Sequence, residues 1–322
     1  MMNLIVRGVE HHYDRTQPDD THNNHIDKLP EAKSLETKPP ETKSLEPITI
    51  VFIHGWLLSR SYWRPVIQRL EGLSCLAYDL RGFGESLLTK ETATTDSYLS
   101  PENYTLAAYA QDLEEILNKL GISRVWLVGH SLGGSVALWA AHKMGSRVAG
   151  VTCVNAGGGI YLKEEFEKFR NAGQQILKFR SSWMLKFPGL DYLFSRASVI
   201  QPIGLELGRQ RLVDFITADP IAARESLLSS TTEAEVHRLP QLLSELTQPV
   251  YFIAGQQDKI MEPRYVRHLA SFHALFKHCG ENVLELENCG HLAMVEHPDA
   301  VAQQIRDALM HEFSEDIRVE AR

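Results

Sequence analysis

The sequence lacks several features that would define a protein class at once. Its longest apolar run, residues 48–53, is far shorter than the ~20 residues that span a bilayer. The N-terminus has no long apolar segment, which disfavours a secretory signal. The chain has 33 Lys and Arg against 41 Asp and Glu, with no basic block, which disfavours a nucleic-acid partner. A soluble intracellular enzyme is therefore the starting expectation.

Cysteine is also scarce, and no two cysteines form a C-x-x-C pair. We therefore expect reduced thiols in a cytoplasmic protein, with neither a disulfide framework nor a cysteine metal site. The four cysteines are Cys75, Cys153, Cys279 and Cys289.

Histidines near the N-terminus offer a second possible metal site, at His11, His12, His22 and His25. Solvated histidines in a flexible segment are the favoured interpretation, because no fixed scaffold would hold them. We predict no metal ion.

Composition divides the chain into five parts. Residues 1–13 predict an N-terminal strand, and residues 14–47 are polar and predict a flexible insertion. Residues 48–157 alternate strand and helix patterns and predict the first part of a core. Residues 158–247 have helical spacing throughout and predict a helical cap, and strand patterns return in residues 248–322 as the second part of the core.

The core pattern favours an α/β fold. The run ITIVFI at residues 48–53 is typical of a strand buried on both faces, as in parallel sheets. Strands that alternate with helices predict a mostly parallel, doubly wound sheet with helices on both faces. The inserted helical block would then lie over the carboxyl ends of the strands, where such sheets bind ligands.

Residues 129–133 read Gly-His-Ser-Leu-Gly, which fits G-x-S-x-G between a predicted strand and a predicted helix. A serine at so sharp a turn needs small neighbours two positions away on each side, because side chains there would clash with adjoining backbone. The pattern alone is weak evidence, but its strand–turn–helix context is strong. We predict that Ser131 is a nucleophile.

A serine nucleophile needs a base and a carboxylate that orients the base, in the chain order Ser, acid, His. Asp258 follows a predicted strand, and His291 lies in a glycine-containing loop after the last predicted strand. The nearest competitors are Glu262 and His297, but both precede a proline and are typical of helix starts. Asp258 and His291 are therefore the predicted acid and base.

The predicted oxyanion hole consists of two backbone N–H groups. One belongs to Leu132, directly after the nucleophile, and the other to Trp56, in the loop after the first core strand. His54 is out of chain order for a triad histidine, and we expect it to hold this loop. The residues predicted to contact substrate are His54, Gly55, Trp56, Leu57, His130 and Trp183.

Five motifs in order resemble the α/β-hydrolase superfamily: HGW (54–56), DLRGFGES (79–86), GHSLGG (129–134), GQQD (255–258) and CGH (289–291). They are most similar to its capped esterase, cofactor-free haloperoxidase and carbon–carbon hydrolase branch. The resemblance implies an eight-stranded sheet, a catalytic triad, and a cap between strands six and seven. It also implies that Asp79, Arg81, Gly82 and Gly84 form a structural turn.

The favoured function is a serine hydrolase that cleaves an ester or thioester through an acyl-enzyme, without metal or organic cofactor. Carbon–carbon bond hydrolysis and cofactor-free perhydrolysis use the same triad and remain alternatives, as does a non-catalytic ligand-binding protein. Epoxide hydrolases and haloalkane dehalogenases are disfavoured, because they need an aspartate where this chain has Ser131.

Aromatic residues in the first part of the cap favour an apolar substrate. Basic residues between them suggest, as a weaker alternative, contact with an anionic membrane surface.

Overall fold

The computed structural model describes residues 2–18, 47–88, 100–158, 163–278 and 280–320. Its centre is an eight-stranded sheet with the order β1-β2-β4-β3-β5-β6-β7-β8. β2 runs antiparallel to both of its neighbours, and the other pairs are parallel, which confirms the predicted mostly parallel sheet. The strands are β1 Met2–Val6, β2 Val9–Thr16, β3 Thr49–Ile53, β4 Ser74–Tyr78, β5 Val125–His130, β6 Val148–Val154, β7 Val250–Gly255 and β8 Val283–Leu286.

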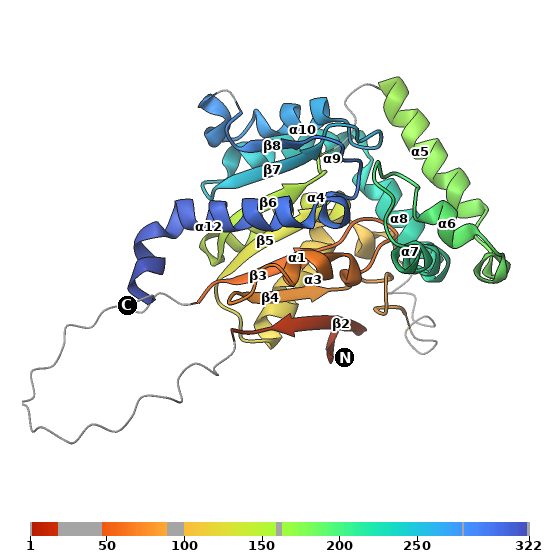
Figure 1. Ribbon diagram of the computed structural model, residues 1–322, viewed down its shortest axis with the longest axis horizontal. Helices are drawn as coiled ribbons and strands as arrows, with labels where there is room; N and C mark the ends of the chain where they lie inside the picture. The colour runs from red at the N-terminus through yellow and green to blue at the C-terminus, as the bar shows by residue number, and fades with distance from the viewer. Residues whose placement is uncertain (1, 19–46, 89–99, 159–162, 279, 321–322) are drawn as a thin grey trace, which may run out of the picture.

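Helices cover both faces of the sheet, as predicted (Figure 1). All five residues of β3 are buried, because its β-branched and aromatic side chains pack against helices on both sides. One face carries α3 Leu106–Lys119, α4 Leu132–Met144, α9 Glu233–Glu245 and α10 Pro263–Ala270. The other face carries α1 Arg64–Ile67, α11 Ala293–Glu296 and α12 Pro298–Glu320. Short 3₁₀ helices are η2 Arg60–Trp63, η3 Pro101–Tyr104, η4 Gly145–Arg147 and η6 Ala274–His278.

The N-terminal prediction needs a correction. Residues 1–13 were expected to form an N-terminal strand with a turn at Gly8. The structure has this turn, with positive φ at both Arg7 and Gly8, but it separates two paired strands, β1 and β2. β2 continues to Thr16, so the predicted insertion, residues 14–47, begins inside a strand. Its residues 19–46 lie outside the described residues, together with His22 and His25.

The interpretation of His11 as a solvated histidine is wrong. It lies in β2, is fully buried, and its Nδ1 is 3.1 Å from the carbonyl oxygen of Asp79. Pairing of β2 with β4 carries this side chain into the interior, and a polar local sequence gives no sign of that pairing. Among the described residues, no cluster of three or more His, Cys, Asp or Glu side chains could hold a metal ion.

The predicted cap, which lies between β6 and β7 in the chain, is helical in its described part. It contains α5 Lys163–Lys178, η5 Ser182–Lys186, α6 Leu190–Phe194, α7 Leu205–Thr217 and α8 Pro220–Ser230. In Figure 1 these helices project from one side of the sheet. The predicted boundary at residue 247 is too late, because α9 packs against α4 and α10, and its leucines belong to the core.

Two smaller observations concern the membrane and the thiols. Within the described ranges, no helix combines the length and apolar character needed to cross a bilayer. Cys75, Cys153 and Cys289 are buried free thiols.

Candidate active site

Ser131 occupies a strained turn between β5 and α4. Its φ of 51° and ψ of −117° lie outside the regions that serine favours, at a cost of about 1–3 kcal/mol. A Cβ on Gly129 would lie 2.2 Å from the carbonyl oxygen of Gly133, and one on Gly133 would lie 2.3 Å from that of Ile53. Both glycines of the G-x-S-x-G motif are therefore required by close backbone approaches, as its spacing predicted.

Asp258 and His291 come together from the loops after β7 and β8. His291 Nδ1 and Asp258 Oδ2 are 2.7 Å apart, and the other carboxylate oxygen accepts the N–H groups of Ile260 at 2.8 Å and Met261 at 3.0 Å. Burial alone would raise the pKa of Asp258. The charge and hydrogen bond of His291, with the two N–H donors, outweigh burial and hold that pKa below its ordinary value. A carboxylate held in this way fixes the orientation of the imidazole.

Asn155 is a residue that the sequence analysis missed. It follows β6 with a φ of 48°, and its buried amide nitrogen donates to Asp258 Oδ2 at 2.9 Å and to the carbonyl oxygen of Gly290 at 3.1 Å. It thus joins the loop of the acid to the loop of the base. The available signal was an asparagine directly after a predicted strand, where that residue type tolerates a left-handed turn.

His130 packs against His291, the predicted base, and does not face open solvent. Its ring centroid is 4.8 Å from that of His291, its Nε2 is 2.7 Å from the His291 carbonyl oxygen, and it is 1% exposed. Burial and the neighbouring His291 lower the pKa of His130 to about 3, so its ring is neutral and Nε2–H donates. The substrate contact predicted for His130 is replaced by support of the His291 backbone.

His54 anchors the loop of the predicted oxyanion hole, residues 54–57, through hydrogen bonds to backbone. This fully buried ring accepts the N–H of Leu80 at Nε2, 2.9 Å away, and donates from Nδ1 to the carbonyl oxygen of Gly55 at 2.8 Å. Both ring nitrogens are used, so His54 holds the loop, as its chain order suggested, and does not contact substrate. Gly55 is also structural, because a Cβ there would lie 2.5 Å from His130 Nδ1.

Trp56 connects this loop to the predicted cap. The half-buried indole of Trp56 donates to the carbonyl oxygen of Ala223 in α8 at 2.8 Å, and Leu57 has a φ of 57° and is 9% exposed. Leu132 begins α4, so its N–H has no partner within the helix. In the described part of the chain, no backbone hydrogen bond uses the N–H of Trp56. Both predicted oxyanion donors are therefore available.

Three other sequence candidates lie elsewhere. Glu262 precedes α10 and contacts Arg264, and His297 bonds the carbonyl oxygen of Asn288 at 3.0 Å. Trp183, predicted to contact substrate, is 58% exposed and packs edge-to-face on Phe187 in the cap. The structure thus gives no support to Trp183 as a pocket residue.

The predicted turn at Asp79 is structural. This buried carboxylate accepts the N–H groups of Arg60 at 2.7 Å and Glu85 at 2.9 Å and pairs with the Arg60 guanidinium. A Cβ on Gly84 would lie 2.4 Å from the Asp79 carboxyl carbon, so the motif is shaped around that group.

Ser131 and His291 are positioned by adjoining loops but are not yet joined. No hydrogen bond links their side chains among the described residues. Nucleophile and base are often loosely aligned before substrate binds, and tighten in the complex. A movement of either side chain that brings Ser131 Oγ within hydrogen-bond reach of His291 Nε2 would let the imidazole activate the hydroxyl.

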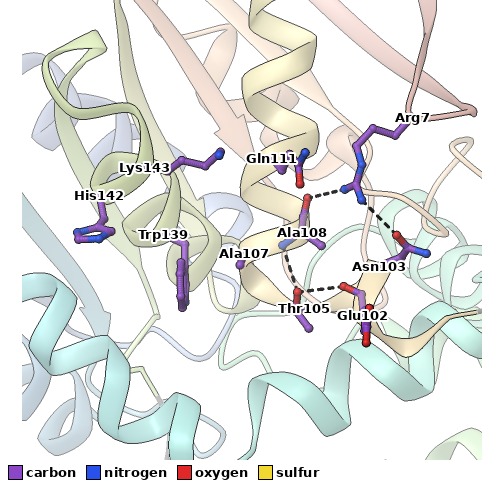
Figure 2. A pocket seen from close by; sticks show the side chains of 10 residues that line it. All are labelled: Arg7, Glu102, Asn103, Thr105, Ala107, Ala108, Gln111, Trp139, His142 and Lys143. Carbon is purple, nitrogen blue, oxygen red and sulfur yellow. Dashed lines mark hydrogen bonds between the residues drawn. The ribbon is translucent and has the colours of Figure 1, made fainter.

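A separate groove of about 680 Å³ lies between α3 and the second half of α4, whereas Ser131 precedes the first residue of α4 (Figure 2). Arg7 at its edge already donates to the Ala108 carbonyl and to Asn103 and pairs with Asp112. The groove is therefore distinct from the candidate active site.

Comparisons with known proteins identify the family of the fold. A family model described as the alpha/beta hydrolase fold matches residues 48–298. A 2-succinyl-6-hydroxy-2,4-cyclohexadiene-1-carboxylate synthase of Serratia proteamaculans is 24% identical over 284 residues, covering 86% of this chain and 99% of the relative. A bifunctional esterase/perhydrolase of Acinetobacter calcoaceticus is 29% identical over 227 residues, covering 66% and 75%. A solved esterase from Thermogutta terrifontis has a TM-score of 0.67 at 21% identity, covering 97% and 99%.

Proposed function

Because this chain belongs to the α/β-hydrolase-fold family, we propose that it is a serine hydrolase that cleaves a carboxylic ester or thioester through an acyl-enzyme. One observation carries the proposal. The 2.7 Å contact between His291 Nδ1 and Asp258 Oδ2 orients an imidazole in the loop beside the strained turn of Ser131. This is the arrangement that nucleophilic acyl transfer requires.

In the proposed reaction, Ser131 Oγ attacks the substrate carbonyl carbon while His291 Nε2 removes the hydroxyl proton. Nε2 is the reacting nitrogen because Nδ1 is held by Asp258. Asp258 stays ionised and stabilises the imidazolium that forms, consistent with its lowered pKa. His291 then gives the proton to the departing alcohol or thiol, leaving an acyl-serine.

Water completes the cycle. His291 takes a proton from it, the resulting hydroxide attacks the acyl carbon, and Ser131 leaves with the proton that His291 returns. In both half-reactions the N–H groups of Leu132 and Trp56 stabilise the oxyanion, and each such donor contributes about 3 kcal/mol. No metal or organic cofactor is needed for these steps.

The surroundings of the predicted oxyanion hole support an apolar substrate. Leu132 carries one predicted oxyanion donor and Leu57 directly follows the other, and both side chains are apolar. Each buried methylene stabilises a complex by about 0.8 kcal/mol, so three added carbons raise kcat/KM by tens of fold. A series of nitrophenyl esters from acetate to octanoate tests this proposal, and a steady fall along the series contradicts an apolar pocket.

The serine mechanism has a direct test. We expect a fluorophosphonate probe to label the wild type but not Ser131→Ala, and we expect Ser131→Ala and His291→Ala to lose turnover while unfolding at nearly the wild-type temperature. Asp258→Asn should lose somewhat less. Full activity of His291→Ala would overturn the assignment. A folded wild type that fails to react with the probe would favour a ligand-binding protein.

Perhydrolysis is the second candidate, favoured by the similarity to a bifunctional esterase/perhydrolase. The same acyl-enzyme would be attacked by hydrogen peroxide instead of water and would release a peracid. Peracid formation from an ester in the presence of peroxide, absent in Ser131→Ala, would establish it. A diketone in the same substrate panel tests carbon–carbon cleavage.

A further inference from the structure

The cap carries a concentration of exposed apolar side chains, in a segment that we call the cap tip, residues 178–196. Seven large apolar side chains among the described residues are more than half exposed, and five of them lie in this segment. They are Phe179 at 76%, Leu193 at 59%, Trp183 at 58%, Tyr192 at 55% and Phe187 at 54%. The core assigned above accounts for none of them.

The cap tip is built on a defined framework. Arg209 of α7 donates to the carbonyl oxygen of Leu185 at 2.7 Å. α6 approaches α7 so closely that a Cβ on Gly208 would lie 2.2 Å from the carbonyl oxygen of Asp191. The rings of Trp183 and Phe187 meet edge-to-face at 5.7 Å. These contacts hold the apolar side chains outward on a preformed surface.

The charge of the cap tip is opposite to that of the whole protein. It contains the cations Lys178, Arg180, Lys186 and Arg196 against a single carboxylate, Asp191, whereas the chain has a net charge of −8. Asp191 is itself paired with Arg209 at 3.4 Å. Arg180 is half-buried and donates to the carbonyl oxygens of Phe215 and Ala218. The exposed cations that accompany the exposed aromatic side chains are Lys178, Lys186 and Arg196.

We propose that the cap tip is a docking surface for an anionic lipid bilayer. Trp, Phe and Leu enter the boundary between headgroups and acyl chains, and Lys and Arg beside them reach the lipid phosphates. An apolar protein partner would satisfy the aromatic side chains but leave this positive charge without a role. The cap helices project from one side of the molecule, so a flat membrane can reach them (Figure 1).

The docking surface is continuous with the candidate active site. Two residues beyond the cap tip, the carbonyl oxygen of Ser198 accepts the N–H of His291 at 2.8 Å. A bilayer bound at the cap tip therefore contacts a segment that reaches the triad histidine. The docking itself does not depend on the proposed function.

Trp183 provides a local probe of this surface. Of the five tryptophans in the chain, Trp183 alone is more than half exposed, and the other four are buried or half-buried. With vesicles of phosphatidylglycerol and phosphatidylcholine we expect a blue shift of its emission and quenching by brominated acyl chains. Both signals should be absent in Trp183→Phe. Pure phosphatidylcholine should give much weaker binding, because it offers no net negative charge.

Vesicle co-sedimentation of surface variants completes the test. We expect Phe179→Ser/Phe187→Ser and Lys178→Glu/Lys186→Glu each to weaken binding at least about tenfold. Exposed residues elsewhere give single-substitution controls, Phe272→Ser and Lys119→Glu, which should bind as the wild type does and are compared with each single cap-tip substitution.

Three outcomes would overturn the proposal. These are no binding to anionic vesicles, binding that leaves Trp183 emission unchanged, and binding equal in cap-tip and control variants. Sedimentation velocity identifies the rival occupant. A wild-type dimer that Phe179→Ser/Phe187→Ser dissociates, without vesicle binding, would assign the surface to a second copy of the chain.

Discussion

Asp214 joins the cap to the loop of the predicted oxyanion hole, and its removal gives the sharpest test of the packing. It lies on α7, is 3% exposed, and accepts hydrogen bonds from Ser59 at 3.0 Å and Gln210 at 2.9 Å. Burial raises the pKa of Asp214 from 3.8 to about 6, against the opposing effect of these hydrogen bonds. The carboxyl group is thus held in a place that favours its neutral form.

Because the pKa of Asp214 is raised in the folded protein, its contribution to stability decreases as the pH rises. The folded state binds the Asp214 proton more tightly than the unfolded state, so its contribution to stability is complete below pH 3.8 and is lost as pH rises through about 6. The rise in pKa from 3.8 to about 6 means that the free energy of unfolding loses roughly 3 kcal/mol in total over this pH range. About 1.4 kcal/mol of this loss falls between pH 5 and pH 8.

Asp214→Asn removes the titration and keeps the shape. The amide oxygen can accept from Gln210, and the amide nitrogen can donate to Ser59, which then donates to Ser61 at 2.8 Å. We therefore expect the variant to gain stability relative to wild type as pH rises, by about 1–2 kcal/mol from pH 5 to pH 8.

Denaturant unfolding of both proteins at several pH values measures this difference, because the other titrating groups cancel. Asp191→Asn, which replaces a half-buried carboxylate of the same cap, is the control for the substitution itself. A stability difference between Asp214→Asn and wild type that stays constant or falls with pH would refute the reasoning.

Three further predictions concern other parts of the molecule. Asn155→Leu should lower kcat roughly ten- to hundredfold, because it removes the charge-assisted hydrogen bond to Asp258. The control is Asn282→Leu, which is equally buried but bonds to β7 and should lower only stability. Deleting residues 19–46 should leave a folded, active enzyme. The end of β2 and the start of β3 both pair with the start of β4 and lie only ~10 Å apart, so a short connection can join them. An insoluble product would contradict this. Trp56→Phe should reduce the free energy of unfolding by ~1 kcal/mol, through loss of the bond to Ala223, and an unchanged melting curve would contradict it.

Local patterns anticipated most of the fold and the identities of the triad candidates. The run from Ile48 to Ile53 predicts a strand buried on both faces because its composition tolerates no solvent-facing side. Gly129 and Gly133, two positions before and after Ser131, indicate the turn because a side chain at either position would clash with backbone. Asp258 and His291 were chosen by chain order, and the structure brings their side chains to 2.7 Å. Their catalytic roles stay predictions until the variants are measured.

Residues whose role depends on distant partners were missed or misread. His11 lies in a polar segment, yet pairing of β2 with β4 buries it. His130 was predicted to contact substrate, but its Nε2 holds the His291 backbone. His54 was expected both to hold its loop and to contact substrate, and its two ring nitrogens are used for the loop alone. Asn155 was overlooked because its partners are more than a hundred residues away in sequence.

The sequence by itself determined the α/β architecture, the turn at Ser131 and the positions of the candidate acid and base. These depend on side-chain period, glycine and proline placement and motif order, which short stretches of chain encode. Only the tertiary structure decided that α9 belongs to the core, that Asp214 is buried against Ser59, and that aromatic residues of the cap face solvent. An amphipathic helix has one apolar face whatever it packs against, and the partner for that face is set by elements far away in the sequence.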